Sequence, residues 1–137
     1  MLVHFPVAFW TVAALAYIAD AAGVEGAAAA AKFGNGAGLI MALLAMAAGL
    51  MELRLIDSRS EAIRVATSHM MAMAAAWFCF MLALVMTTSA AASLDKQIAQ
   101  LAAVAAASVG FLLISVGGWL GGRLVYEFGI GAATHKE

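Results

Sequence analysis

Two histidines are the residues of this sequence whose type and setting could do chemistry. His4 belongs to the N-terminal segment LVHFP, and His69 lies in an apolar segment with no formally charged residue from Val65 to Met86. Such a run can cross a hydrocarbon layer of roughly 30 Å, because a helix rises about 1.5 Å per residue. Ionisable groups are costly in lipid, so they usually face protein and mark functional sites. His69 is therefore the leading candidate ligand.

Ligation of a haem iron is the chemistry that suits two imidazoles in this setting. Helical bundles build cofactor sites from inward side chains on facing helices, so His4 and His69 could hold one haem b between them. Small residues would leave room for the flat macrocycle: Ala66, Ala72, Ala74, Ala75, Ala76, Gly117, Gly118 and Gly121. Polar side chains at the same membrane face would anchor its propionates: Arg54, Arg64, Arg123 and Tyr126. We therefore expect a b-type haem protein of electron transfer.

A metal-ion or proton site is the first alternative. Glu52 lies just inside the second apolar segment, where its carboxylate could orient an imidazole or act as a ligand beside it. His4, Glu52 and His69 would then form the working site of a transporter or channel subunit.

Copper or another transition metal is the alternative cofactor. Met70, Met71 and Met73 surround His69 in the sequence, and thioether and imidazole ligands suit Cu(I). Methionine is also an ordinary filler of cores and lipid-facing surfaces. The methionines therefore indicate copper less strongly than the histidines indicate haem.

A structural membrane subunit that docks a redox partner is the third alternative. In that case His69 hydrogen-bonds Glu52 or a backbone carbonyl and only fixes helix packing, while His4 caps its helix or lies among the lipid head groups. His135, in the Gly-rich C-terminal tail, is expected to be solvated. An enzyme is the least supported class, because no nucleophile, phosphate-binding loop or paired carboxylates are suitably arranged.

The composition places these residues in a membrane protein. The chain has 137 residues, of which 66% are hydrophobic and 11% charged, with a mean hydropathy of +1.00, and soluble globular domains are not this apolar. The lipid bilayer is therefore the expected partner. The formal net charge is -1 and no basic block occurs, so we expect no nucleic acid partner.

Four apolar segments predict an all-α, up-and-down four-helix bundle with a single domain over residues 1–137. The expected spans are about 4–22, 37–56, 65–86 and 97–120. Residues 27–32 fit either the start of the second helix or a short interfacial turn, because the glycines that follow them weaken a helix. Ser93 or Asp95 is the expected cap of the fourth helix.

Alternating span directions bring residues that are distant in sequence to one membrane face. His4, Glu52, His69 and the segment 121–127 share that face. Of the seven Lys and Arg residues, five are on this side and two, Lys32 and Lys96, are on the other. Short loops rich in Lys and Arg stay in the cytoplasm. We therefore expect an inner-membrane protein with both termini and the histidines at the cytoplasmic face.

Glycines with four-residue spacing predict close helix packing in the fourth span. Gly117 and Gly121 form one pair, and Gly118 and Gly122 the other. Such pairs let membrane helices approach closely. They could pack the fourth helix on the first, make room for a cofactor, or form the seam of a homodimer.

The chain resembles a bacterial family of predicted membrane proteins, domain of unknown function 2231. The matching features are LVHFP at residues 2–6, Asp20, Gly49 with Glu52, His69, and GGRLVYEFGIG at residues 121–131. The resemblance implies a four-span unit, and the fusion of some members to redox modules such as Rieske domains implies electron-transfer surroundings. Many relatives carry His where Phe128 stands here, so a site in this chain has to work without that imidazole.

Overall fold

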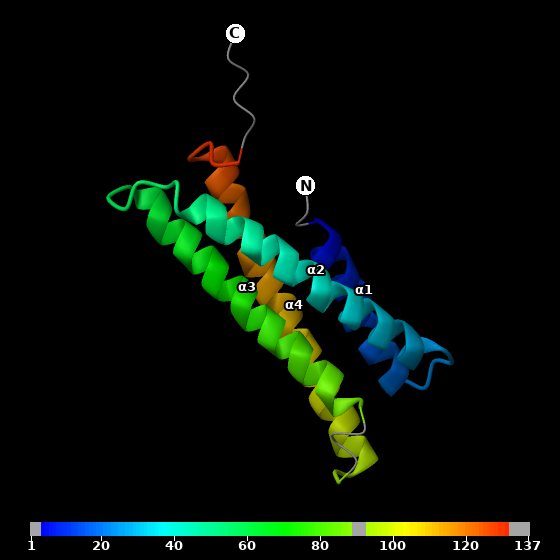
Figure 1. The fold of residues 1–137 in the computed structure, drawn as a ribbon. Coiled ribbons are helices and arrows are strands. Elements are labelled where there is room, and N and C mark those ends of the chain that lie inside the picture. Colours follow the sequence, from blue (N-terminus) through cyan, green and yellow to red (C-terminus); the bar gives the residue numbers. More distant parts are fainter. Residues whose placement is uncertain (1–3, 89–92, 132–137) are drawn as a thin grey trace.

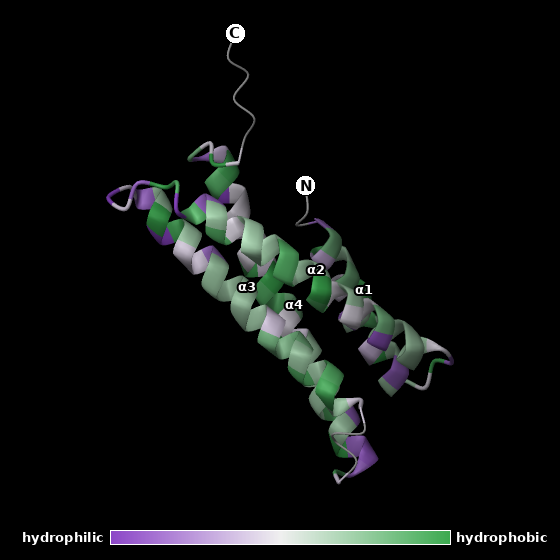
Figure 2. Ribbon diagram, in the orientation of Figure 1, coloured by the Kyte–Doolittle hydropathy of each residue, from purple (hydrophilic) through white to green (hydrophobic). Residues whose placement is uncertain are grey.

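The computed structural model describes residues 4–88 and 93–131, so His135 and Lys136 lie outside the described part. Four α-helices make up the fold: α1 (His4–Ala21), α2 (Ala27–Leu53), α3 (Glu61–Met86) and α4 (Lys96–Tyr126). Each is long and apolar enough to cross a membrane. Hydrophilic residues gather at the helix ends and connections, with mostly apolar residues between them (Figure 2). The predicted all-α membrane bundle is confirmed.

The four helices form two antiparallel hairpins that pack side by side (Figure 1). The most extensive contacts are those within the hairpins, between α1 and α2 and between α3 and α4. Between the hairpins, α1 packs on α4 and α2 packs on α3. This arrangement makes α1 and α3 diagonal neighbours, which meet only where large side chains reach across the centre.

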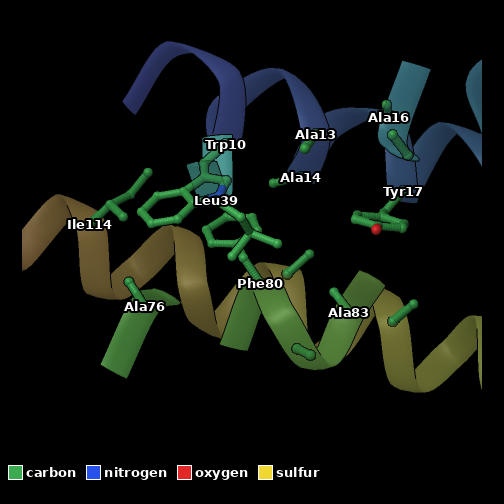
Figure 3. Close-up of a cluster of buried hydrophobic side chains, with 14 of the residues drawn as sticks. Trp10, Ala13, Ala14, Ala16, Tyr17, Leu39, Ala76, Phe80, Ala83 and Ile114 are labelled. Carbon is green, nitrogen blue, oxygen red and sulfur yellow. The ribbon is translucent and has the colours of Figure 1, made fainter. Parts of the chain in front are cut away.

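Trp10 and Phe80 make that central contact between α1 and α3. Their rings stack with centroids 4.8 Å apart and an interplanar angle of 5°, and both side chains are fully buried. Leu39 of α2 and Ile114 of α4 lie beside them (Figure 3). Offset stacking of this kind adds about 0.5–1.5 kcal/mol to the burial of the rings. The stack therefore helps to set the level along the bundle axis at which the two hairpins pack against each other.

Helix α2 begins earlier than the span predicted at residue 37, because its glycines serve packing. A Cβ on Gly34 would lie 3.2 Å from the carbonyl oxygen of Phe9, and one on Gly38 would lie 2.5 Å from Cδ1 of Trp10. Close contact with α1 thus outweighs the low helix propensity of glycine, which costs about 1 kcal/mol per residue. Residues 27–32 are the start of α2 and not an interfacial turn.

The ends of the helices follow local signals. The turn between α1 and α2 contains Gly23 and Gly26 with φ of 82° and 79°, values that glycine adopts without a Cβ clash. The carboxylate of Asp95 accepts hydrogen bonds from the amides of Gln97 and Ile98 at 2.8 and 3.2 Å, which confirms Asp95 as the cap of α4. Helix α4 continues past the predicted end at residue 120 to Tyr126.

Candidate functional site

The imidazole of His69 is held by the backbone of α4. Its Nδ1 lies 2.7 Å from the carbonyl oxygen of Gly117. A carbonyl only accepts hydrogen bonds, so we assign the ring proton to Nδ1, which leaves a lone pair on Nε2. This is how metal-ligating histidines are usually oriented. The alternative that His69 hydrogen-bonds a backbone carbonyl is therefore the arrangement observed, and it leaves the second nitrogen for a ligand.

Glycines of α4 make room for this ring. A Cβ on Gly121 would lie 3.2 Å from Cε1 and 3.3 Å from Nδ1 of His69, and one on Gly117 would lie 2.6 Å from the sulfur of Met73. The Nδ1–Cε1 edge of the imidazole thus faces α4. The Gly117 and Gly121 pair packs α4 against α3, whereas Gly118 has no atom within 4 Å of a built Cβ.

A small cavity lies beside His69, between α1, α2 and α3. Its volume is about 50 Å³. Helix α1 contributes Pro6 and Trp10, α2 contributes Met46 with three small residues, and α3 contributes His69, Met70 and Met73. One imidazole and three thioether side chains therefore line a single, mostly apolar space.

Trp10, which lines the cavity, has a buried indole N–H without a hydrogen-bond partner. The side chain is fully buried, and Nε1 has no partner. A Cβ built on Gly38 of α2 would lie 2.7 Å from Nε1, so this nitrogen lies against α2. Leaving a buried donor unpaired costs about 1–3 kcal/mol.

His4 begins α1 and is not among the residues that line the cavity. Its side chain is exposed, whereas Pro6, half a helical turn further on, is buried. Pro6, two residues after His4, lines the same cavity as His69, so the start of α1 lies near His69 although the His4 side chain is not in the cavity wall. Haem ligation by this pair stays a prediction.

Glu52 lies at the C-terminal end of α2 and is exposed. Its carboxylate approaches the last turn of the described chain, with Oε2 3.8 Å from a Cβ built on Gly131. Within residues 4–88 and 93–131, no three His, Cys, Asp or Glu side chains are grouped closely enough to hold a metal ion. The structure therefore does not bring His4, Glu52 and His69 together as one site. The alternating direction of the four helices determines which membrane face each residue lies near, but it does not determine where its side chain points.

The predicted propionate anchors all lie on the outside of the bundle. Arg64 is exposed and lies 3.7 Å from Glu61, and Tyr126 is 90% exposed. Arg123 forms a short salt bridge with Glu127 at 2.8 Å, and its guanidinium lies over the Trp119 ring at 5.4 Å. Arg54 is exposed as well, and none of the four predicted anchors lines the cavity beside His69.

A second cavity, which the sequence analysis missed, opens at the opposite end of the bundle. Its volume is about 570 Å³, and all four helices line it, with Tyr17 and Asp20 from α1. Asn35 lies behind Tyr17 and donates hydrogen bonds to the Tyr17 hydroxyl at 2.9 Å and to the Phe80 carbonyl at 2.8 Å. Among the described residues, Asn35 is the only buried polar side chain. An amide side chain in an apolar span was the signal that could have revealed this site.

The comparisons with known proteins agree with the fold and leave the activity open. The model of a family described as "Predicted membrane protein (DUF2231)" matches residues 1–134. No curated protein and no solved structure matches the chain.

Proposed function

The chain belongs to the DUF2231 family of predicted membrane proteins, and we propose that it binds one soft transition-metal ion, Cu(I), through Nε2 of His69. The observation that carries this proposal is the 2.7 Å contact between Nδ1 of His69 and the Gly117 carbonyl. That contact directs the ring and, in the neutral imidazole, leaves the lone pair of Nε2 for a ligand.

Methionine sulfurs supply the remaining ligands. Met46, Met70 and Met73 line the same cavity as His69. Thioether sulfur is a soft donor that selects Cu(I) over harder divalent ions, and imidazole completes such a set. With neutral imidazole and thioether ligands the site carries the single charge of Cu(I), which is less costly to bury between membrane helices than the double charge of a divalent ion.

The size of the cavity favours a bare ion over a macrocycle. Its volume of about 50 Å³ is well below the roughly 300 Å³ at which sites for drug-sized organic ligands begin. A metal ion with a few water molecules fits this volume, since each water needs about 10–15 Å³ by this measure.

Haem b is the second candidate, with electron transfer as its role. Gly117 of α4 orients the imidazole of His69, and an imidazole held in this way suits iron as well as copper. His4, at the start of α1, would supply the second imidazole ligand. A haem would require α1 and α2 to separate from α3, because the present space holds no macrocycle. A visible spectrum separates the two candidates: a Soret band lost in both His4→Ala and His69→Ala indicates haem.

The experiment that tests the copper site is anaerobic titration of the purified protein with Cu(I) against a chromogenic chelator. We expect one tightly bound ion per chain and none in His69→Ala. Met70→Leu should weaken binding by about tenfold, which corresponds to roughly 1.4 kcal/mol for one lost ligand.

Met71→Leu is the matched control, since Met71 is the next residue and is 68% exposed. Its affinity should equal that of the unmodified protein. Equal losses in Met70→Leu and Met71→Leu would contradict a site inside the cavity.

The His69 end of the bundle is proposed to face the cytoplasm. Arg54, Arg59, Arg64 and Arg123 lie at that end, against Lys32 and Lys96 at the other, and Lys and Arg are retained on the cytoplasmic side. In this orientation the second cavity opens to the outer face of the membrane.

A further inference from the structure

We propose that the second cavity binds the phosphate head group of an anionic membrane lipid. The cavity, called the vestibule below, lies at the end of the bundle where α1 and α3 end and α2 and α4 begin. Such helix ends lie at the depth of the lipid head groups when the four helices span a bilayer. At about 570 Å³ its volume is in the range of small-molecule sites.

The charges of the vestibule favour an anion. Lys32 of α2 and Lys96 of α4 line it from separate hairpins, and Asp20 is the acidic residue among its lining side chains. One carboxylate oxygen of Asp20 accepts a hydrogen bond from the Gln100 amide at 3.0 Å. The lining thus carries two ammonium groups and one carboxylate, which is hydrogen-bonded to Gln100. The phosphate of a lipid would balance the positive charge that remains.

The start of α2 adds a further positive end to the same space. Gly26 is its N-cap and provides no side chain to cap the first amides, and no acidic residue lies in the first turn. Ala28 of this first turn lines the vestibule. The amide of Ala27 bonds to the Val24 carbonyl at 3.3 Å, and the amides that follow it in the first turn could bind phosphate oxygens. By contrast, the N-terminus of α4 is already capped by Asp95.

The lining also accounts for the choice of a lipid over a free anion. Met86, Leu94, Ala99 and Ala103 form an apolar part of the wall next to the charged groups, and an acyl chain or glycerol backbone would cover that part. Tyr17, only 2% exposed, forms part of the lining and is held by Asn35. The vestibule therefore combines a cationic rim with an apolar side, as an amphiphile requires.

Native mass spectrometry of the purified full chain tests this proposal. The protein would be mixed with phosphatidylglycerol or with phosphatidylcholine at equal amounts. We expect one phosphatidylglycerol to stay bound per chain. The double variant Lys32→Gln, Lys96→Gln should lower the retention of this lipid by about tenfold or more, because each basic residue near the membrane surface contributes appreciably to anionic lipid binding. Lys32→Arg with Lys96→Arg should keep it.

Arg54→Gln with Arg59→Gln is the matched control, since it removes two exposed charges at the other end of the bundle. Its lipid retention should be unchanged. Equal retention of the two lipids, or an equal loss in the control, would overturn the proposal. Displacement of the lipid by inorganic phosphate would also overturn it and would assign the vestibule to a free anion.

Discussion

Nδ1 of His69 lies 2.7 Å from the carbonyl oxygen of Gly117, and this contact joins the imidazole on α3 to the backbone of α4. The bond uses the nitrogen nearest α4 and leaves the other nitrogen for chemistry. Because a helix carbonyl is a rigid acceptor, the direction of the ring depends on how closely α4 approaches α3.

Gly121→Ala tests whether that approach controls the site. Its Cβ would lie 3.2 Å from Cε1 of His69, so the imidazole has to shift and its bond to Gly117 weakens. We expect the affinity for Cu(I) to fall by about tenfold. Loss of a group that orients a metal ligand typically lowers metal affinity by about 10–100-fold, and this substitution should lie at the lower end of that range. Gly118→Ala is the control, because no atom lies within 4 Å of its Cβ. Equal affinities for the two variants would contradict the orienting role of α4.

Gly38→Ala should destabilise the bundle. The new Cβ would lie 2.5 Å from Cδ1 of Trp10, and Trp10 cannot move because it is stacked on Phe80. Overpacking of this kind costs about 1–3 kcal/mol. Gly36→Ala, with no atom within 4 Å, should be neutral or stabilising, since alanine favours a helix. Denaturant unfolding in detergent measures both, and an unchanged midpoint for Gly38→Ala would argue against the contact between α1 and α2.

Asn35→Leu should loosen the contact between the hairpins. Asn35 joins Tyr17 of α1 to the Phe80 carbonyl of α3, and hydrogen bonds between membrane helices contribute about 0.6 kcal/mol each on average. We expect a loss of about 1 kcal/mol in unfolding free energy. Thr67→Val serves as the control, because the exposed Thr67 hydroxyl bonds only to Ile63 in its own helix. A larger effect of Thr67→Val would contradict the bridging role of Asn35.

The salt bridge at the end of α4 predicts a pH dependence. The hydrogen bond from Arg123 lowers the pKa of Glu127 below its ordinary value of 4.5. A lowered pKa means that the stabilisation is fully present above the ordinary value and is lost as the pH falls through the lowered one. Unfolding of the protein and of Glu127→Gln should therefore differ at neutral pH and converge in acid. A difference that grows in acid would contradict this sign.

The orientation in the membrane can be measured with introduced cysteines. In a Cys79→Ala background, Val24→Cys marks the connection of α1 to α2 and Ser58→Cys marks that of α2 to α3; both positions are exposed. A membrane-impermeant maleimide added to intact cells should label the first and not the second. The reverse pattern would place His69 at the outer face.

The sequence predicted the four spans and Ser93 or Asp95 as the cap of α4, because hydropathy and local spacing carry that information. A bond of His69 to Glu52 or to a backbone carbonyl was only the structural alternative to haem ligation. The sequence did not predict the position of His4 relative to His69. Span order assigns both to one membrane face, whereas the direction of each side chain around its helix depends on contacts such as that of Trp10 with Phe80.

The start of α2 and the vestibule depend on tertiary contacts in the same way. Gly34 and Gly38 are poor helix formers by themselves and become favourable only where α1 packs against them. Asn35 interrupts the apolar pattern of α2, but its partners belong to α1 and α3. A pattern within one segment contains no signal for partners on other helices.

Copper analysis of the purified protein after anaerobic loading with Cu(I) tests the central claim most directly. The claim is that Nε2 of His69 ligates an ion in the cavity of about 50 Å³. We predict one copper per chain in the unmodified protein and in Met71→Leu, and none in His69→Ala. Equal copper in His69→Ala, or a Soret band in place of bound copper, would contradict the account.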